Sequence, residues 1–238
     1  MKSAIVVGAS SGIGRELAKL LSQNGYRVGL AARRRDLLET LQGELSRGAV
    51  IKEMDVSQPA SAMRQLGELL EEMQDVELIV ISAGTGAINL ELDWSKEAAT
   101  IETNVTGFAA VANVAIAHFA QRGSGHLVGI SSIAALRGSD ISPAYYASKA
   151  FQSNYLEGLR KKMVKAGLPV TITEVQPGLV DTAMAQGEGL FWIAPVEKAA
   201  RQIYDAISRK KDHVYVTKRW RLIAWLLKVL PASLYNKK

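Results

Sequence analysis

The fold is decided by the stretch Ala4-Ile5-Val6-Val7-Gly8-Ala9-Ser10-Ser11-Gly12-Ile13-Gly14-Arg15-Glu16-Leu17-Ala18. In it an apolar run passes through a glycine-rich turn into a helical pattern. Glycines let a backbone turn tightly and approach a pyrophosphate, and a helix N-terminus offers free N–H groups. The spacing G-x-x-x-G-x-G predicts a dinucleotide-binding loop made by Gly8, Ser10, Ser11, Gly12, Ile13 and Gly14, with a purely structural turn as the alternative. A triphosphate loop needs Lys-Ser or Lys-Thr after the last glycine, where this chain has Arg15-Glu16.

Apolar runs alternate with amphipathic stretches along the rest of the chain, as in a parallel sheet covered on both faces. The expected strands are Ala4–Val7, Arg27–Ala31, Val50–Glu53, Leu78–Ile81, His126–Ile130, Val170–Val175 and Val214–Val216. The expected helices span residues 13–24, 34–46, 59–74, 97–122, 144–166 and 195–209. The pattern predicts one doubly wound α/β domain over residues 1–217, with about seven parallel strands, and a basic tail over residues 218–238.

Composition excludes several classes of protein. With 238 residues, of which 48% are hydrophobic and 22% charged, the chain is neither disordered nor fibrous and can bury a sizeable core. It has no cysteine, which excludes disulfides, thiolate metal sites and cysteine nucleophiles. The histidines at positions 118, 126 and 213 lack the spacing of metal ligands, so we expect no metal site.

The positive charge lies in the tail. Residues 210–238 carry eight Lys or Arg and one Asp, a net charge of +7, which leaves −1 for residues 1–209. A nucleic-acid-binding protein more often spreads its basic footprint over a folded face, so we expect no nucleic-acid partner. The sequence opens without a signal-peptide pattern and has no apolar run near the ~20 residues that span a bilayer, so the expected location is the cytoplasm.

The end of the second expected strand bears on the choice of cofactor. It reads Ala31-Ala32-Arg33-Arg34-Arg35, and the first acidic residue after it is Asp36. A site that prefers NAD places an Asp or Glu here to bind the ribose hydroxyls, whereas the planar fork of arginine suits a phosphate. The sequence predicts NADP(H) in preference to NAD(H), with Arg33 as the first candidate and Arg34 beside it, while one of the three arginines only opens a solvated helix.

Tyr145 and Lys149 lie four residues apart in an expected helix, so their side chains share one face. A free tyrosine titrates near ~10, and a neighbouring ammonium together with the field of a nicotinamide ring would lower that pKa. Ser132 ends the fifth expected strand, where a hydroxyl can donate to a developing alkoxide. Asn104 interrupts an apolar helical pattern, where an amide needs a specific partner. These four residues are the candidate catalytic group.

With these motifs the chain resembles the short-chain dehydrogenase/reductase family over about residues 3–216. The matching motifs are the Gly8/Gly12/Gly14 loop, Asp55-Val56, Ala83-Gly84, Asn104, Ser132, Tyr145 with Lys149, and Pro177-Gly178-x-Val180-x-Thr182. The resemblance implies that Tyr145 gives or accepts the proton, and that Lys149 holds the nicotinamide ribose and lowers the tyrosine pKa. It also implies that Ser132 orients the substrate oxygen and that Asn104 fixes a water which relays protons.

The resemblance further implies the remaining contacts of the cofactor. Asp55 would contact the adenine amine with Val56 alongside, while Thr182 and the backbone near Val180 would hold the carboxamide. Residues 183–195 would form a lid, in which Gly187 and Gly189 permit movement. The apolar lid residues Met184, Leu190, Phe191 and Trp192 would line a pocket or else pack the lid onto the body. The helices over residues 97–122 and 144–166 would form the interface of a homodimer or homotetramer.

The chain departs from the family pattern at one turn. Where the family usually has Asn-Asn-Ala-Gly, this chain has Ile81-Ser82-Ala83-Gly84, so we expect this turn to be held differently. Tyr146 follows Tyr145 but lacks a lysine four residues on, and we expect it to pack rather than react.

Arg219 to Pro231 form a short segment rich in Leu and Trp and flanked by cations. Such a helix either packs on the body or a neighbouring subunit, or lies on a membrane surface as a peripheral contact. For the whole chain, the expected function is an NADP(H)-dependent oxidoreductase for a small-molecule carbonyl or alcohol. Acyl-thioester, lipid and sugar ketones are candidate substrates. The alternative is a nucleotide-sensing scaffold without turnover.

Overall fold

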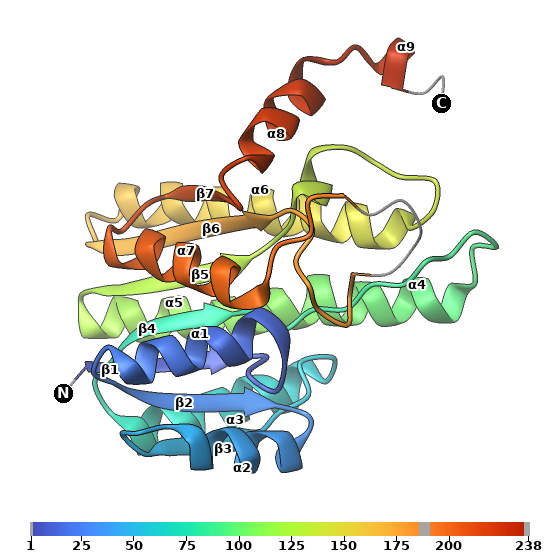
Figure 1. Ribbon diagram of the computed structural model, residues 1–238. Coiled ribbons are helices and arrows are strands. Elements are labelled where there is room, and N and C mark those ends of the chain that lie inside the picture. The colour runs from blue at the N-terminus through green and yellow to red at the C-terminus, as the bar shows by residue number, and fades with distance from the viewer. Residues whose placement is uncertain (1, 186–190, 236–238) are drawn as a thin grey trace.

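The computed structural model describes residues 2–185 and 191–235. Within these residues seven strands form one parallel sheet in the order β3-β2-β1-β4-β5-β6-β7, which confirms the predicted doubly wound α/β fold (Figure 1). The strands are β1 (Lys2–Val7), β2 (Tyr26–Ala32), β3 (Ala49–Glu53), β4 (Val76–Ile81), β5 (Gly125–Ile130), β6 (Val170–Pro177) and β7 (His213–Val216).

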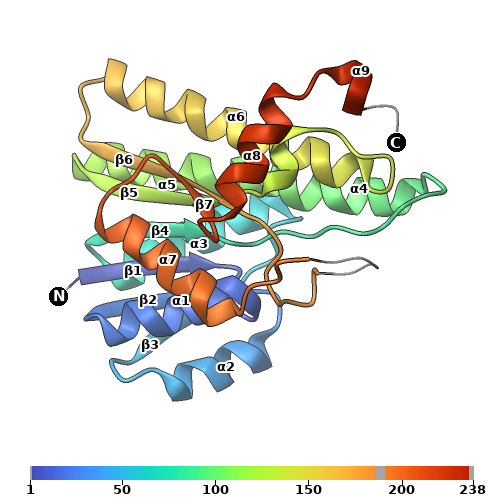
Figure 2. The ribbon, with the colours of Figure 1, turned by 45° about the horizontal axis from the view of Figure 1, so that its top comes forward.

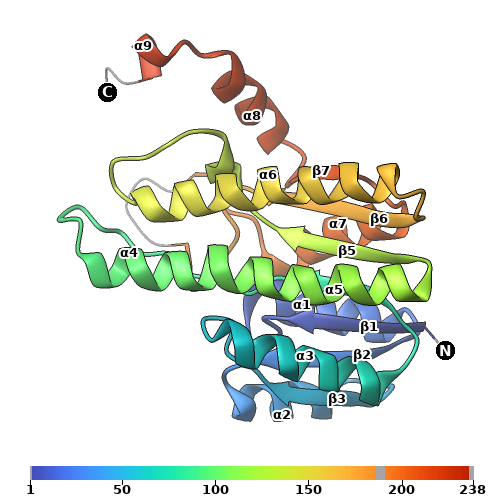
Figure 3. The same cartoon turned by 180° about the vertical axis from the view of Figure 1, so that it is seen from behind.

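Helices cover both faces of the sheet. One face packs against α1 (Gly12–Gln23), α2 (Arg35–Glu44) and α7 (Val196–Ser208). The other face packs against α3 (Pro59–Met73), α5 (Phe108–Arg122) and α6 (Pro143–Lys165), which lie in front of the sheet in Figure 3.

Strand β1 explains this two-sided cover. Ala4 and Val6 enter the core with α1, α2 and α7, whereas Ile5 and Val7 enter the core with α3, α5 and α6. Successive side chains of a strand point to opposite faces, so a strand that is apolar at every position needs a helix layer on each side.

The predicted helix over residues 97–122 is divided in the structure. Helix α4 (Trp94–Ile101) continues into a π-helical turn, η1 (Glu102–Gly107), before α5 begins at Phe108. Here the chain passes close to the segment after β3, because a Cβ on Gly107 would lie 2.2 Å from the carbonyl oxygen of Val56. Single π turns within helices frequently occur at functional sites, and this turn contains Asn104.

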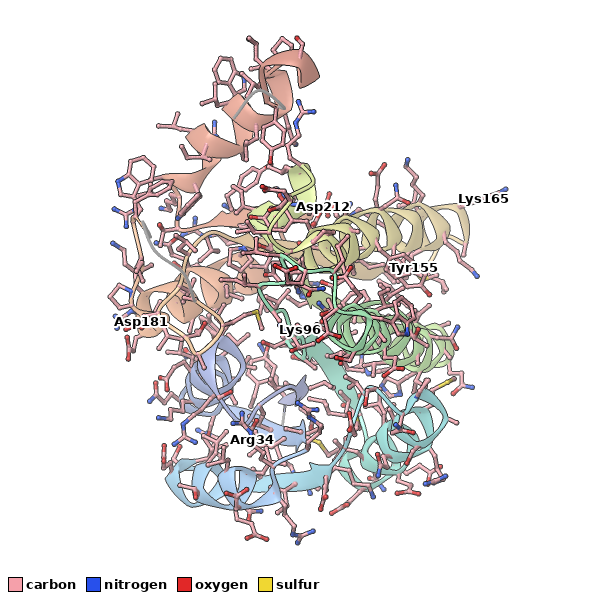
Figure 4. All side chains as sticks on the ribbon, turned by 90° about the vertical axis from the view of Figure 1, so that its right-hand side faces the viewer. Arg34, Lys96, Tyr155, Lys165, Asp181 and Asp212 are labelled. Atoms are coloured by element: carbon pink, nitrogen blue, oxygen red, sulfur yellow. The ribbon has the colours of Figure 1, made fainter. Side chains whose placement is uncertain are left out.

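The order of the strands reverses at β1, which leads to β2 and β3 on one side and to β4 through β7 on the other. Ligands of open α/β sheets bind in the crevice beyond the carboxyl ends of the strands at such a reversal. Figure 4 looks onto this edge, where Arg34 follows β2 and Asp181 follows β6.

After β7 the chain leaves the layered body. A tail of α8 (Trp220–Val229) and the short α9 (Ala232–Tyr235) stands away from the sheet and its helices (Figure 2). Among the helices of residues 2–185 and 191–235, none has both the length and the apolar character needed to cross a bilayer.

Candidate active site

The glycine loop joins β1 to α1 at the crevice. Gly8 and Gly12 have φ angles of 92° and 55°, a region that glycine adopts without steric cost. A Cβ on Gly8 would lie 2.4 Å from the Ala83 nitrogen, and one on Gly14 would lie 2.2 Å from the Gly8 oxygen. The loop therefore packs too closely for side chains at Gly8 and Gly14, and it leads into the α1 N-terminus, where helical N–H groups are free. The loop residues that line the crevice are Gly8, Ser10, Ser11, Gly12 and Ile13.

The turn after β4 is held by backbone hydrogen bonds, which accounts for the departure at Ser82. The nitrogens of Ser82 and Ala83 both donate to the Val7 oxygen, at 2.8 and 2.9 Å. The turn is therefore fixed to β1 without the second asparagine of the family pattern, and Ala83 and Gly84 line the crevice.

The three arginines after β2 have different surroundings. Arg34 donates from Nη2 to the hydroxyl oxygens of Ser10 and Ser11, at 2.9 and 2.8 Å. Arg33 is exposed and lines the same crevice. Arg35 instead pairs with Glu39 one turn along α2, at 2.8 Å. Two arginines thus stand beside the glycine loop, and Arg35 belongs to the solvated face of the helix.

Asp55 and Val56 follow β3 and line the crevice on the side of the arginines. The Oδ1 atom of Asp55 accepts hydrogen bonds from the backbone nitrogen and the hydroxyl of Ser57, at 3.0 and 2.8 Å. These bonds hold the carboxylate in one orientation at the crevice.

Tyr145 and Lys149 lie one turn apart on α6. The Lys149 ammonium is 5.7 Å from the centre of the Tyr145 ring, and it donates to the Ile130 oxygen at 3.2 Å and to the Oε1 atom of Gln152 at 3.0 Å. The tyrosine ring packs against Gly86, where a Cβ would lie 2.5 Å from a ring carbon. Helix and loop together therefore fix the position of the ring.

Burial disfavours the charged form of both side chains. It raises the pKa of Tyr145 above its ordinary value of 10.0, although a hydrogen bond with Ser132 acts in the opposite direction. It lowers the pKa of Lys149 from 10.5 to about 8. The expected lowering of the tyrosine pKa included the field of a nicotinamide ring, so it stays a prediction for the protein with its dinucleotide bound.

Ser132 follows β5 and begins a 3₁₀ turn, η2 (Ile133–Leu136). Its hydroxyl oxygen accepts from the Ala134 nitrogen at 3.1 Å, and the hydroxyl donates to the Pro177 oxygen at 3.5 Å. The preceding Ser131 instead donates to Glu174 of β6 at 2.7 Å. Of the two serines, Ser132 is the one that interacts with Tyr145.

Asn104 is fully buried behind the crevice. Its Oδ1 atom accepts from the Thr85 nitrogen at 2.8 Å, and its Nδ2 atom donates to the Thr85 oxygen at 2.7 Å and to the Ser148 hydroxyl at 3.0 Å. Its backbone oxygen accepts from Gln152 at 2.9 Å. The side chain thus fixes the loop after Gly84, so the structure assigns Asn104 a positioning role, and the expected water relay stays a prediction.

Gln152 and Gly86 are site residues that the motifs did not predict. Gln152 is fully buried and links Lys149 to the backbone of Asn104. Its position three residues after Lys149, on the same helix face, was the available signal. Gly86 follows the Ala83-Gly84 motif by two residues, but a sequence does not reveal that a tyrosine ring will pack against it.

The segment after β6 forms part of the crevice wall, next to the glycine loop. A Cβ on Gly12 would lie 3.2 Å from the Thr182 side chain, so Thr182, which directly precedes the lid, lies against the glycine loop. Met184 lines the crevice, whereas Phe191 and Trp192 pack their rings against Trp220 of α8, at 5.3 and 6.1 Å between ring centres. The lid residues Gly187, Gly189 and Leu190 lie outside the described residues.

The crevice is one continuous cleft of about 690 Å³. It brings together all the candidate residues except Gly14 and Asn104, which support it from behind. The predicted residues that line it are Gly8, Ser10, Ser11, Gly12, Ile13, Arg33, Arg34, Asp55, Val56, Ala83, Gly84, Ser132, Tyr145, Lys149, Pro177, Gly178, Val180 and Thr182. No cluster of His, Cys, Asp or Glu suited to a metal ion occurs in the described part of the chain.

Comparisons with known proteins agree with this geometry. The family model for short chain dehydrogenase matches residues 2–190. An uncharacterized oxidoreductase of Myxococcus xanthus is 37% identical, over 77% of this chain and 74% of that protein. One of Mycobacterium tuberculosis is 30% identical, over 98% of this chain and 95% of that protein.

Two solved structures share the fold. A short chain dehydrogenase/reductase of Burkholderia phymatum in complex with NAD has a TM-score of 0.83 at 21% identity, covering 94% of this chain and 92% of that chain. An alcohol dehydrogenase of Thermococcus sibiricus complexed with 5-hydroxy-NADP has a TM-score of 0.78 at 23% identity, covering 91% and 96%. The match of the family model over most of the sequence, with these relatives and this architecture, means that the chain belongs to the short-chain dehydrogenase/reductase family of oxidoreductases.

Proposed function

We propose that the chain is an NADP(H)-dependent oxidoreductase that interconverts a ketone or aldehyde and the corresponding alcohol, with Tyr145 as general acid and base. One observation carries the proposal. A single cleft joins the glycine loop and two arginines to Tyr145, Lys149 and Ser132. A dinucleotide-binding end and a proton-transfer end are thus parts of the same site.

The residues of the cleft fit a dinucleotide. Gly8 and Gly14 have no room for a Cβ, so the loop backbone is tightly packed, and it lies at a helix N-terminus, where a pyrophosphate can bind. Solved structures of this fold carry NAD in one case and an NADP derivative in another, so the preference must come from this chain's own residues. Arg33 and Arg34 at the end of β2 support NADP(H), because their guanidinium groups suit a ribose phosphate.

The bound dinucleotide would supply the hydride in reduction and accept it in oxidation. During reduction the Tyr145 hydroxyl would donate its proton to the substrate oxygen, and the Ser132 hydroxyl would hold that oxygen in place. The raised pKa of Tyr145 keeps the phenol protonated at neutral pH, as a proton donor requires. Lys149, held by Gln152 and Ile130, would bind the ribose of the dinucleotide and stabilise the phenolate that remains.

The walls near Tyr145 favour a substrate with apolar substituents. Ile88 of the segment after β4, Ile141 before α6 and Met184 of the lid all line the cleft. Tyr146 also lines it, with its ring edge against Tyr145 at 5.9 Å between centres. These side chains support lipid or acyl-thioester ketones over sugars, which would need more polar partners.

The test compares wild type and Tyr145→Phe with NADPH and a panel of lipid, acyl-thioester and sugar ketones and aldehydes. General acid catalysis contributes about 10²–10⁴-fold, and we expect the variant to lose activity in that range. Tyr146→Phe is the matched control and should stay within a few-fold of wild type. Nucleotide binding without turnover of any substrate would favour the sensing scaffold, and equal activity of Tyr145→Phe would refute the proposed acid.

Cofactor preference is tested separately with arginine variants. Arg33→Ala and Arg34→Ala should raise the KM for NADPH and leave that for NADH nearly unchanged. Arg35→Ala, whose side chain pairs with Glu39, should change neither. A wild-type enzyme that uses NADH as well as NADPH would refute the preference and leave the rest of the proposal intact.

Self-association stays a proposal. By the family resemblance, the interface of a homodimer or homotetramer would lie on α4 with α5 and on α6. Light scattering after size-exclusion chromatography measures the mass directly, and a monomeric wild type would refute it.

A further inference from the structure

Helix α8 carries two apolar stripes on opposite sides. Trp220 and Ala224 are buried against the body. The other stripe consists of Leu222, Trp225, Leu226 and Val229, which follow the i, i+3, i+4, i+7 spacing of one helix face and are 48–69% exposed. We call these four residues the outer stripe. Packing of the tail on the body therefore accounts for only one side of α8 and leaves the outer stripe without a partner in the described residues.

The body holds α8 in a fixed orientation. At the start of the helix, Trp220 packs so closely on Gly178 that a Cβ there would lie 2.1 Å from the indole ring. Near its end, Arg137 donates from Nε to the Leu227 oxygen at 2.8 Å and also to the Leu230 oxygen. The contacts of Arg137 satisfy carbonyl groups that a helix end leaves free. Because α8 is held at both ends, the outer stripe on its opposite side faces away from the body.

The lid adds aromatic side chains beside the first turn of α8. Arg219 donates to the Trp192 oxygen at 2.9 Å and lies over its ring at 5.2 Å. Phe191 and Trp192 contact Trp220 and are themselves 51% and 41% exposed. The outer stripe and these two lid aromatics make up what we call the tail surface. Helix α8, which carries the outer stripe, stands out from the body in Figures 1 and 2.

The charged side chains of the tail segment itself are of one sign. Residues 218–235 contain Lys218, Arg219, Arg221 and Lys228 and no acidic residue. Arg221 is exposed on α8 next to the outer stripe, and Lys218 is exposed just before the helix. Lys228 instead lies over the ring of Tyr215, at 6.0 Å, in a pocket that Glu157 and Glu174 also line. A partner that binds the tail surface must therefore offer both negative charge and an apolar region.

This requirement separates the candidate partners. A second copy of the chain would bring its own cations against these cations, which opposes symmetric pairing of two outer stripes. Nucleic acid would satisfy the charges but would leave Leu222, Trp225 and their neighbours exposed to water. An anionic bilayer offers phosphate headgroups beside acyl chains, and a short cationic helix with Leu and Trp is suited to that boundary.

We propose that the tail surface docks on an anionic phospholipid membrane, with α8 lying in the interface and the lid aromatics beside it. The exposed side chains of the outer stripe would enter the headgroup boundary. Lys218 and Arg221 would bind lipid phosphates.

The test is sedimentation of the full chain with vesicles of phosphatidylcholine alone, or of phosphatidylcholine with phosphatidylglycerol in equal amounts. We expect binding to the mixed vesicles, little binding to the neutral ones, and weaker binding in high salt. Each cation near an anionic surface contributes enough that Lys218→Gln with Arg221→Gln should weaken binding about 30-fold. Leu222→Ser with Trp225→Ser should abolish it.

Trp94→Ser is the matched control, because Trp94 is 72% exposed but lies beside Asp93, away from the tail surface. It should bind like wild type, and thermal melting should show that every variant is folded. Absence of wild-type binding to the mixed vesicles overturns the proposal, as does undiminished binding by the Leu222→Ser, Trp225→Ser variant. If that variant instead converts a wild-type dimer into a monomer in the absence of lipid, the outer stripe is a subunit interface and the proposal also fails.

Discussion

Replacement of Lys149 by Met should change how stability depends on pH. Burial lowers the pKa of this lysine in the folded protein to about 8, against 10.5 for an unhindered lysine. Between these two values the unfolded chain binds more protons than the folded chain, so wild-type stability rises with pH across that window. Below about pH 8 both states hold the proton, so stability no longer changes with pH and the cost of the buried ammonium is at its full size.

The magnitude follows from the two pKa values. At about pH 9.5 the folded lysine is mostly neutral and the unfolded one mostly charged, which is worth about 2 kcal/mol relative to pH 7. Lys149→Met lacks this gain. The variant also leaves the Ile130 oxygen and Gln152 without their lysine partner, but that cost does not depend on pH and cancels when the two pH values are compared.

The assay is urea unfolding of wild type and variant at both pH values, read by circular dichroism. We expect the stability difference between the two proteins to move by about 2 kcal/mol in favour of wild type at the higher pH. Lys165→Met is the control, because Lys165 is exposed at the end of the same helix (Figure 4). Parallel pH curves for wild type and Lys149→Met would refute the reasoning, since they would mean that the buried lysine titrates as it does in water.

Three further predictions concern the cleft and the tail. NADP(H) affinity should fall by up to about tenfold per pH unit above pH 8, because binding to the Lys149 ammonium then requires uptake of a proton. Calorimetry in buffers of different ionisation enthalpy should detect that proton. Gly86→Ala should lower kcat by about 10²-fold with little change in nucleotide affinity, because the new Cβ displaces the Tyr145 ring. Its control is Gly138→Ala, which has open space around the new Cβ and should have wild-type steady-state kinetics. Trp220→Ala should cost about 3–5 kcal/mol in the free energy of unfolding, while exposed Trp225→Ala should change it by less than about 0.5 kcal/mol in the same denaturant titration.

The fold and the glycine loop could be predicted because their signals are local. The apolar run before Gly8, the loop spacing and the helix after it are all read from consecutive residues. The Tyr145 and Lys149 pair is local too, since one helical turn connects them. The arginines after β2 follow the end of a strand, so their place at the crevice follows from the parallel sheet.

The remaining features depend on contacts between distant segments. Sequence spacing gave no reason for Arg34 to bind the hydroxyls of Ser10 and Ser11, which lie on a different strand-to-helix turn. The same holds for Trp220 on Gly178, which ties the tail to the segment after β6. The π turn at Asn104 was visible only as a polar interruption, and the sequence did not show that Gly107, at its end, lies against the Val56 backbone.

The burial of Lys149 bears on whether the chain is an enzyme or a scaffold. An ammonium whose pKa is lowered to about 8 by burial destabilises the folded protein at neutral pH, and the surrounding core must offset that cost. A scaffold that only senses a nucleotide could hold it with the glycine loop and the arginines, at the other end of the cleft. The cost is instead incurred beside Tyr145, where Gln152 and Asn104 add a buried hydrogen-bond network to hold the lysine in place. Perturbed ionisable groups concentrate where proton transfer requires them, so this arrangement favours turnover.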